Sequence, residues 1–128
     1  MNYMNIANSV PALREITQLR LPYAKARDIY KACKLFEEEY NFFLQEEKKL
    51  VEEYAARTKD GNLAVAANGA ITFKSQEAKQ EYVKKFTELG LQECDINIKP
   101  IKLNAEEFGN QMISPETMAR LAGIIDFE

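Results

Sequence analysis

The feature that most constrains the fold is the stretch after Pro22, which contains neither glycine nor proline as far as Thr58. Apolar side chains recur in it at alternating spacings of four and three, the heptad-like pattern of an amphipathic helix. This apolar line consists of Ile29, Cys33, Phe36, Tyr40, Phe43, position 47, Leu50 and Tyr54. The spacing predicts one long helix over 22–58, about 55 Å in length, which would extend beyond a compact core as an arm.

Shorter elements are expected on both sides of this helix. Ser9 can cap a first helix over 9–20, with Pro11 in its opening turn, where a missing N–H costs little. The pair Asn68-Gly69 between two β-capable runs predicts a β-hairpin over 63–73 with a type I′ turn.

The remainder of the chain continues the alternation of helix and extended segment. A helix is expected over 76–89, ended by Gly90 in the left-handed conformation. An extended edge segment over 94–103 follows, because Pro100 cannot serve a central strand. A short helical turn comes next, with Asn104 and Glu107 as a capping box, and the run "SPET" begins a last helix over 115–125.

These elements predict a mainly α fold with a small β component, an α+β chain. We expect a long antiparallel helical hairpin with a β-hairpin at its tip, short N- and C-terminal helices and an extended edge segment. The length suits a single domain over 1–128. No internal repeat and no linker is evident.

The residue inventory argues against catalysis and against bound cofactors. The chain has no histidine, which removes serine and cysteine systems based on histidine as well as histidine-containing metal sites. Its two cysteines are expected to be reduced and mostly buried. Glycines occur singly, so no phosphate-binding loop is present. We therefore expect a protein that is not an enzyme, with no metal and no cofactor.

The charge balance restricts the class of partner. The net charge is −3 and the isoelectric point about 5.2, which weighs against a nucleic-acid partner, since phosphate contacts need a clustered basic surface. No apolar run approaches the roughly 18 residues of a membrane span, and the N-terminal residues do not form a signal peptide. We expect a protein without membrane contact.

The acidic run Glu37 to Glu39 lies between aromatic residues and raises the question of a carboxylate site. Successive helical residues turn by about 100°, so these three side chains splay around the helix instead of converging. A pair of catalytic carboxylates must aim at one point. A solvated helix face is therefore the expected role of the run.

Glu47 falls in the middle of the apolar line, where leucine or phenylalanine would be expected. An unpaired buried carboxylate is costly, so the side chain must be exposed, paired or protonated. Three interpretations stay open: the core ends there, a polar pair fixes register or oligomeric state, or the carboxylate contacts a ligand.

Leu35 and Phe42 lie seven residues apart and away from the apolar line. They can pack against another helix of the same chain, or they can form an exposed patch for a second subunit or a partner. Together with Glu38, Glu46 and Glu47 they are the candidate protein interface.

The segment "VPALREITQLRLPYAKARDIYKACKLFEEEYNFFLQEEKKLVEEYA" resembles small uncharacterised phage and prophage proteins of Gram-positive bacteria, a long-helix family of unknown function. The matching features are Leu21-Pro22, Asn68-Gly69, the extended piece from Ile96 to Leu103, and Ser114-Pro115. The alanine-rich "LAVAANGA" departs from that pattern. The resemblance implies a phage origin and transfers no active site. With a phage origin, the expected location is the bacterial host cytoplasm or, after incorporation, the virion.

The leading hypothesis is a non-enzymatic phage protein that acts through protein–protein contacts of a long amphipathic arm. We expect a homo-oligomer that is an accessory or assembly component of the phage particle, with a phage or host protein as partner.

Two alternatives come from other classes. An acidic inhibitor of a host defence system would use Glu37, Glu38, Glu46, Glu52 and Glu53 against a basic channel. A small-ligand or nucleotide sponge would need basic contacts near the junction of the first two helices, with Arg20 and Arg27 as candidates and Arg14 or Lys31 as further donors.

Overall fold

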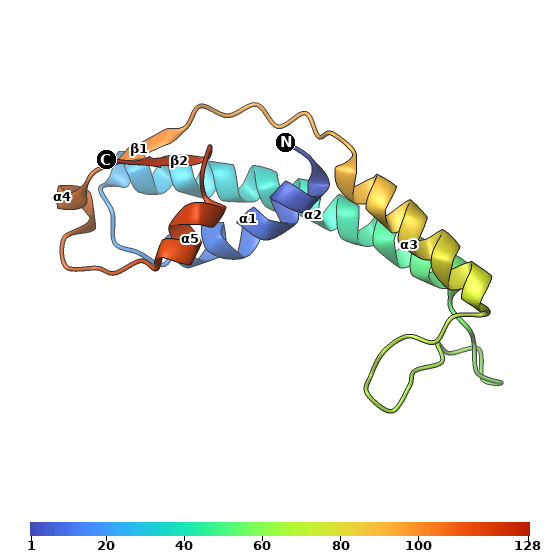
Figure 1. Cartoon of the computed structure of the whole chain (residues 1–128). Coiled ribbons are helices and arrows are strands. Elements are labelled where there is room, and N and C mark those ends of the chain that lie inside the picture. The colour runs from blue at the N-terminus through green and yellow to red at the C-terminus, as the bar shows by residue number, and fades with distance from the viewer. The chain divides into compact units, whose positions relative to one another are not determined.

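The computed structural model describes residues 1–128 and is mainly helical with one two-stranded parallel sheet, an α+β chain (Figure 1). The chain divides into two compact units. Unit 1 comprises Met1–Tyr40 and Glu93–Glu128, and unit 2 comprises Asn41–Gln92. Helix α2 (Tyr23–Tyr54) contributes to both, because different elements pack against its earlier and later turns.

Helix α1 spans Tyr3–Ile16 and begins earlier than the predicted 9–20. Its N-cap is Asn2, whose side chain accepts a hydrogen bond from the Asn5 amide at 2.9 Å, while the Asn5 side chain accepts from the Asn2 amide at 3.0 Å. This reciprocal capping box satisfies two amides that a helix start leaves unpaired. The helix therefore begins after the cap at Asn2 and not at the cap predicted at Ser9.

Ser9 and Pro11 lie inside α1 and not at its start. The buried Ser9 hydroxyl donates to the Asn5 carbonyl at 2.8 Å and contacts the Arg120 carbonyl at 3.1 Å. Its polar group therefore joins α1 to the C-terminal part of unit 1. The helix ends at Ile16, short of the predicted Arg20, because the next turn forms tighter bonds three residues apart.

Helix α2 is uninterrupted over Tyr23–Tyr54, where 22–58 was predicted. The Pro22 carbonyl accepts the first helical bond, from the Ala26 amide at 2.9 Å. The helix ends before Thr58 because the amide of Ala56 donates to the Thr72 carbonyl at 2.7 Å instead of continuing the helical ladder.

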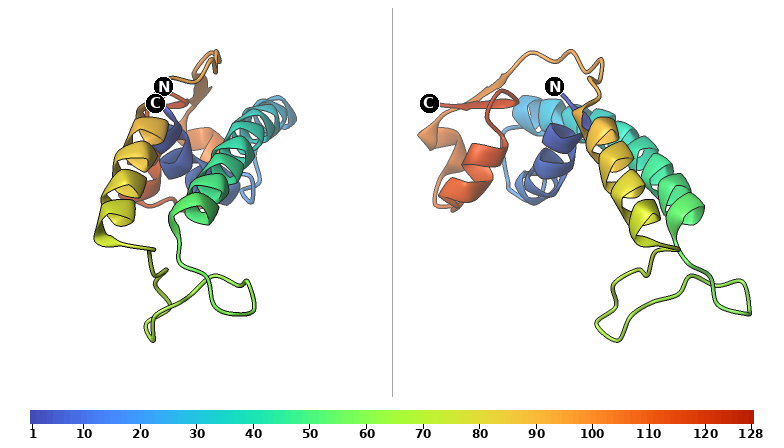
Figure 2. Two further views of the ribbon diagram at one scale, coloured as in Figure 1. Left: turned by 90° about the vertical axis from the view of Figure 1, so that its right-hand side faces the viewer. Right: turned by 45° about the vertical axis from the view of Figure 1, so that its right-hand side comes forward.

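The core of unit 1 lies between α1, the first turns of α2 and the C-terminal elements, with α5 beside α1 (Figures 1 and 2). Its fully buried large side chains include Ile6, Val10, Leu13, Ile16, Ile29, Phe36, Leu103, Leu121 and Ile124. The apolar line of α2 supplies two of these, Ile29 and Phe36.

A short parallel sheet covers part of this core. Strand β1 (Ile101–Leu103) pairs with β2 (Ile125–Phe127) in the register Ile101↔Ile125, Lys102↔Asp126 and Leu103↔Phe127. Of the predicted extended segment 94–103, only β1 is a strand. Between the two strands lie α4 (Ala105–Phe108), with the capping box of Asn104 and Glu107, and α5 (Pro115–Arg120), with Ser114 as its N-cap.

The predicted last helix over 115–125 is too long. After Arg120 the chain turns at Gly123, whose φ is +84°. The amides of Ile124 and Ile125 both donate to the Leu121 carbonyl at 2.9 Å. Ile124 and Ile125 are buried there, and the β-branched Ile125 starts β2, where its shape suits a strand.

Unit 2 contains the last turns of α2 and helix α3 (Gln76–Leu91), which lies alongside them (Figures 1 and 2). Phe43 of α2 meets Phe86 with ring centroids 5.9 Å apart, and Tyr82 contacts both Phe86 and Phe73. Gly90 was predicted to end this helix in the left-handed conformation. It is instead buried within α3, and no positive φ occurs at that residue.

Residues 55–75, which join α2 to α3, form a three-way junction where a simple β-hairpin over 63–73 was predicted. Three antiparallel bridges each begin one branch: Ala55↔Phe73, Arg57↔Leu63 and Val65↔Ile71. At the centre the Ala56 amide donates to Thr72 (2.7 Å), Thr72 to Ala64 (3.0 Å), and Ala64 back to Ala56 (2.9 Å). A closed triangle of backbone hydrogen bonds therefore holds the branches together.

Two branches of the junction close with the same turn. The Thr58 amide donates to the Asn62 carbonyl and the Ala66 amide to the Ala70 carbonyl, each at 2.8 Å. Positive φ occurs only at the glycine of each turn, Gly61 or Gly69, and not at Asn68, so the predicted type I′ turn is wrong. A type I turn followed by a left-handed glycine is the usual geometry of a three-residue loop.

The junction also has a regular internal spacing. The turns "TKDGN" and "AANGA" begin at positions 58 and 66, and the central residues lie at 56, 64 and 72, a constant spacing of eight. None of the helices is both long and apolar enough to cross a membrane.

Candidate functional site

One concave surface of unit 1 is a groove of about 530 Å³ between α2 and the segment that enters β1. Its lining consists of Lys25, Asp28, Lys31, Ala32, Leu35 and residues 98–102. On α2 these side chains recur at three- and four-residue spacings, which places them on one helix face. We call this surface the basic groove.

The basic groove combines an apolar floor with a positive rim. Ala32 and Leu35 line it from α2, and Ile98 and Ile101 line it from the opposite side. Its charged side chains are four lysines (Lys25, Lys31, Lys99 and Lys102) and the single carboxylate of Asp28, which leaves +3. The whole chain carries −3, so this groove concentrates positive charge on an otherwise acidic protein.

The main groove of unit 2 lies along α2 and α3 and measures about 460 Å³. Leu50 and Leu89 line it, surrounded by Glu46, Lys49, Glu53, Lys85, Glu88 and Gln92. Each helix supplies charges of both signs. Lys49 forms an ion pair with Glu46 at 2.9 Å, and the Lys85 ammonium lies 5.6 Å from the Tyr54 ring. We call this surface the mixed-charge groove.

The predicted interface residues fall on different surfaces. Leu35 is 37% exposed and lines the basic groove, whereas Phe42, 47% exposed, belongs to unit 2. Glu38 is exposed, and Glu46 lines the mixed-charge groove. Glu47 is half-buried, and its charge is the second cause, after burial, that raises the pKa of the Tyr82 hydroxyl.

The predicted ligand contacts Arg20 and Arg27 line neither groove. The backbone of Arg20 is held by the Gln111 side chain, which accepts from its amide at 2.5 Å and donates to its carbonyl at 2.7 Å. The Arg27 guanidinium contacts the Tyr23 hydroxyl at 3.5 Å. Of the basic residues considered from sequence, only Lys31 lines the basic groove.

The two thiols are free and lie beside carboxylates. Burial, followed by the charge of Glu37, raises the pKa of Cys33 to about 11. The Cys33 sulfur lies 3.7 Å from a Glu37 oxygen that also accepts a hydrogen bond from Arg14 at 2.8 Å. This bond from Arg14 lowers the pKa of Glu37. A protonated thiol that donates to a carboxylate is a weak nucleophile.

Cys94 has a similar environment. Burial and a hydrogen bond to Glu39 raise its pKa to about 11. The Tyr3 hydroxyl donates to the same carboxylate at 3.2 Å, and burial is the main cause that raises the pKa of Tyr3 to about 12. Both cysteines are therefore protonated at neutral pH, and their surroundings do not activate them for catalysis.

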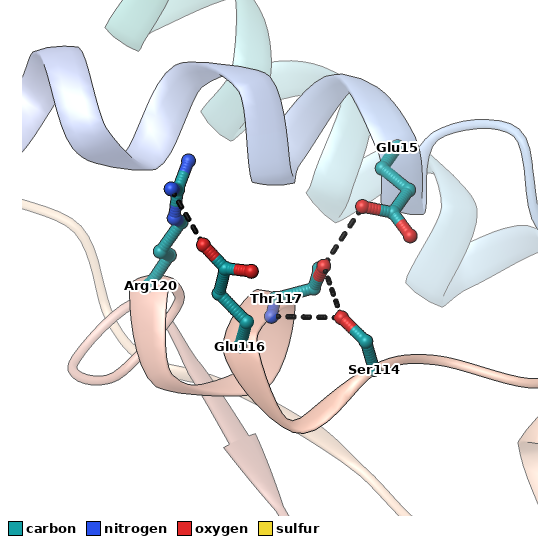
Figure 3. A network of polar contacts seen from close by, with 5 residues as sticks. All are labelled: Glu15, Ser114, Glu116, Thr117 and Arg120. Atoms are coloured by element: carbon teal, nitrogen blue, oxygen red, sulfur yellow. Dashed lines mark hydrogen bonds and ion pairs between the residues drawn. The ribbon is translucent and has the colours of Figure 1, made fainter.

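A polar network joins α5 to α1 (Figure 3). The buried Thr117 hydroxyl donates to a Glu15 carboxylate oxygen at 2.8 Å and accepts from the Ser114 hydroxyl at 2.9 Å. Ser114 also accepts from the Thr117 amide at 3.2 Å as the helix cap. Nearby, Arg120 pairs with Glu116 at 2.7 Å. Ser114 and Thr117 together form the N-terminal cap of α5, which accounts for the polar contacts between them. The network therefore stabilises the fold of unit 1.

Sequence reasoning missed the basic groove because its two sides lie far apart in the sequence. A signal is present in part: Lys25, Asp28, Ala32 and Leu35 share helical spacing, while Lys99 shortly precedes β1 and Lys102 lies within it. Nothing in the sequence shows that these two segments meet. No group of three metal-ligating side chains is present in the structure.

Comparison with protein-family models, with curated proteins and with solved structures returned no match to this chain.

Proposed function

We propose that the protein is a non-enzymatic component that acts through protein–protein contacts of the arm formed by α2 and α3, with a second copy of the chain as its first partner. In this role it is an accessory or assembly component of a phage particle. The phage setting rests on the resemblance given above. We also infer that α2 and α3 work as an antiparallel helical hairpin.

The observation that carries this proposal is the mixed-charge groove of unit 2. Leu50 and Leu89 offer apolar contact, while α2 and α3 each supply both acidic and basic side chains around them. A surface of this kind is self-complementary, because a two-fold related copy can place each lysine opposite a glutamate. Charged side chains that flank an apolar line set partner choice in the same way in coiled coils.

The outer surface of the arm supports the same conclusion. Leu44 and Val83 are 39% and 52% exposed, and Val65 of the tip is 59% exposed. In the aromatic core of unit 2, Phe43 meets Phe86. The arm therefore has apolar side chains left for contact with another protein.

Light scattering tests the proposal with two charge-matched double variants. K49E/K85E makes the groove uniformly acidic, whereas K48E/K84E changes the neighbouring lysines, which do not line it. We expect an oligomeric mass for the wild type and for K48E/K84E, and a monomeric mass for K49E/K85E, because like charges then face each other across the interface. A wild-type protein that stays monomeric at every concentration contradicts the proposal, as does an equal effect of the two variants.

A further inference from the structure

We propose that the basic groove of unit 1 binds an extended acidic peptide of another protein, which adds as a strand to the open edge of β1. This site goes beyond the proposed function, since it lies in unit 1 and shares no residue with the mixed-charge groove. Four observations carry the inference: the open edge of β1, the sequence of β2 on its other edge, an apolar floor and a lysine rim.

The first observation is that β1 is paired on one edge only. The Ile101 amide donates to the Ile124 carbonyl at 2.9 Å, and the Leu103 carbonyl accepts from the Glu128 amide at 2.8 Å. Backbone groups alternate in direction along a strand, so those of Lys102 face the opposite edge. The backbone of Ile98 and Lys99 also makes no hydrogen bond within the chain. An unpaired edge of this kind is a template for an added strand.

The second observation is the sequence of β2, which shows what kind of strand β1 accepts. Ile125, Asp126, Phe127 and Glu128 alternate apolar and acidic side chains. In the register of the sheet Asp126 lies opposite Lys102. A strand added to the other edge would also lie beside Lys102. An acidic residue opposite this lysine would stabilise the pairing, because opposite charges on neighbouring strands attract each other.

The third and fourth observations come from the side chains of the groove. Ala32 and Leu35 provide an apolar floor, on which alternate apolar side chains of a peptide can pack. Lys25 and Lys31 stand on the α2 side and Lys99 and Lys102 on the strand side, so alternate carboxylates find positive charge on both sides. The same lysines, with Pro100, keep neutral and basic strands away from the edge, which makes the site selective for acidic sequences.

Fluorescence anisotropy tests the site with a labelled peptide of alternating glutamate and valine. Two controls are a peptide of alternating lysine and valine, and a peptide in which the same glutamates and valines form two separate blocks. We expect only the alternating acidic peptide to bind, with an affinity that falls as salt is added. Equal binding of the block peptide overturns strand addition, because charge attraction alone would then explain the signal.

Two charge-matched variants locate the binding site. K31E/K102E reverses two lysines of the groove, whereas R27E/K34E reverses two exposed cations of α2 that do not line it. We expect the first to weaken peptide binding by about tenfold or more, and the second to change it by less than about threefold. Equal losses in both variants, or no binding by the wild type, overturn the proposal.

Amide hydrogen exchange supplies the readout that is specific to strand addition. On addition of the acidic peptide, the Lys102 amide is expected to become protected, because it gains a backbone partner. Binding without protection at Lys102 contradicts the proposed geometry. Full competition by inorganic phosphate or by ATP also overturns it, since the groove would then be an anion site. Peptide binding that persists in K49E/K85E separates this site from the oligomer contact.

Discussion

At the scale of single residues, Glu47 shows how the chain tolerates a charge on an apolar line. Its side chain is half-buried, neither fully solvated nor enclosed, and it lies near Tyr82 of α3. Burial first, and the charge of Glu47 second, raise the pKa of Tyr82. The charge of Glu47 therefore acts on a residue of the facing helix α3.

The Thr117 hydroxyl is expected to contribute measurably to the stability of unit 1. It is buried and bonded to both Glu15 and Ser114. Thr117→Ala removes both bonds and should lower the free energy of unfolding by about 1–2 kcal/mol. Urea denaturation measures this change. In the control Thr87→Ala the lost hydroxyl is exposed, so the change should stay within about 0.5 kcal/mol. Equal changes in the two variants would contradict the role given to Thr117.

The thiols predict a loss of stability in alkaline solution. The pKa values of Cys33 and Cys94 rise from 9.0 to about 11 in the folded chain. Above the unfolded value the unfolded chain releases these protons while the folded chain retains them. Stability therefore falls as pH rises through that interval, after which both states are deprotonated. We expect the urea midpoint to fall over this range, and to fall less in C33A/C94A. A midpoint independent of pH would refute this account.

At the scale of elements, the three-way junction explains why α2 ends where it does. The amides of Ala56, Ala64 and Thr72 form a closed triangle that competes with further helical turns. Each of the two looped branches depends on one glycine, Gly61 or Gly69, with φ of +81° and +85°. Any other residue is strained in that conformation.

Gly69→Ala is expected to loosen the junction without unfolding unit 1. The left-handed conformation should cost about 1 kcal/mol for a residue with a side chain. Amide hydrogen exchange should therefore accelerate at Ala64 and Thr72, which the branch closed by Gly69 connects, and remain unchanged at Leu13 of α1. Ala67→Ser, in the same turn but at negative φ, serves as the control. Unchanged exchange at Ala64 and Thr72 in Gly69→Ala would show that the turn does not support the triangle.

Local signals in the sequence predicted the mainly helical α+β character and much of the element order. The uninterrupted periodicity of α2 and the caps Asn104 and Ser114 depend on neighbouring residues only, which is why they are legible in the sequence. Strand β2 is different, because its pairing partner β1 precedes α4 and α5 in the chain. The junction was missed because its hydrogen bonds join three segments, whereas a hairpin signal relates only two neighbouring runs. The capping box of Asn2 was missed because Ser9-Val-Pro11 offered a competing start.

The candidate sites likewise include residues that the sequence indicates and residues that only the tertiary structure brings together. Glu46 was named from the sequence among the carboxylates of a candidate interface, and it lines the mixed-charge groove. The basic groove could not be predicted, since it exists only where residues 98–102 lie against α2. Leu35 was singled out as an apolar residue away from the main line, but its neighbours Lys99 and Lys102 depend on tertiary structure.

At the scale of the whole molecule, the net charge does not reveal that the chain has two grooves with different charge patterns. The chain carries −3, yet unit 1 contains a groove with an excess of +3. Unit 2 contains a groove in which three glutamates and two lysines surround leucines. Each surface lies within one compact unit, so each can be changed by charge reversal without altering the other. The proposed self-association by unit 2 and the proposed peptide binding by unit 1 should therefore be separable by mutation.

The most direct test of the central claim, self-association through the mixed-charge groove, is a charge-swap experiment read by light scattering. K49E/K85E leaves the groove wholly acidic, and E46K/E53K/E88K leaves it wholly basic. Each variant alone is expected to be monomeric, and an equimolar mixture should regain the oligomeric mass, because opposite charges then meet across the interface. Misfolded variants would not regain the oligomeric mass on mixing, so a restored mass excludes misfolding as the reason why each variant alone is monomeric. A mixture that stays monomeric while the wild type is oligomeric would place the contact elsewhere, and a monomeric wild type would contradict self-association altogether.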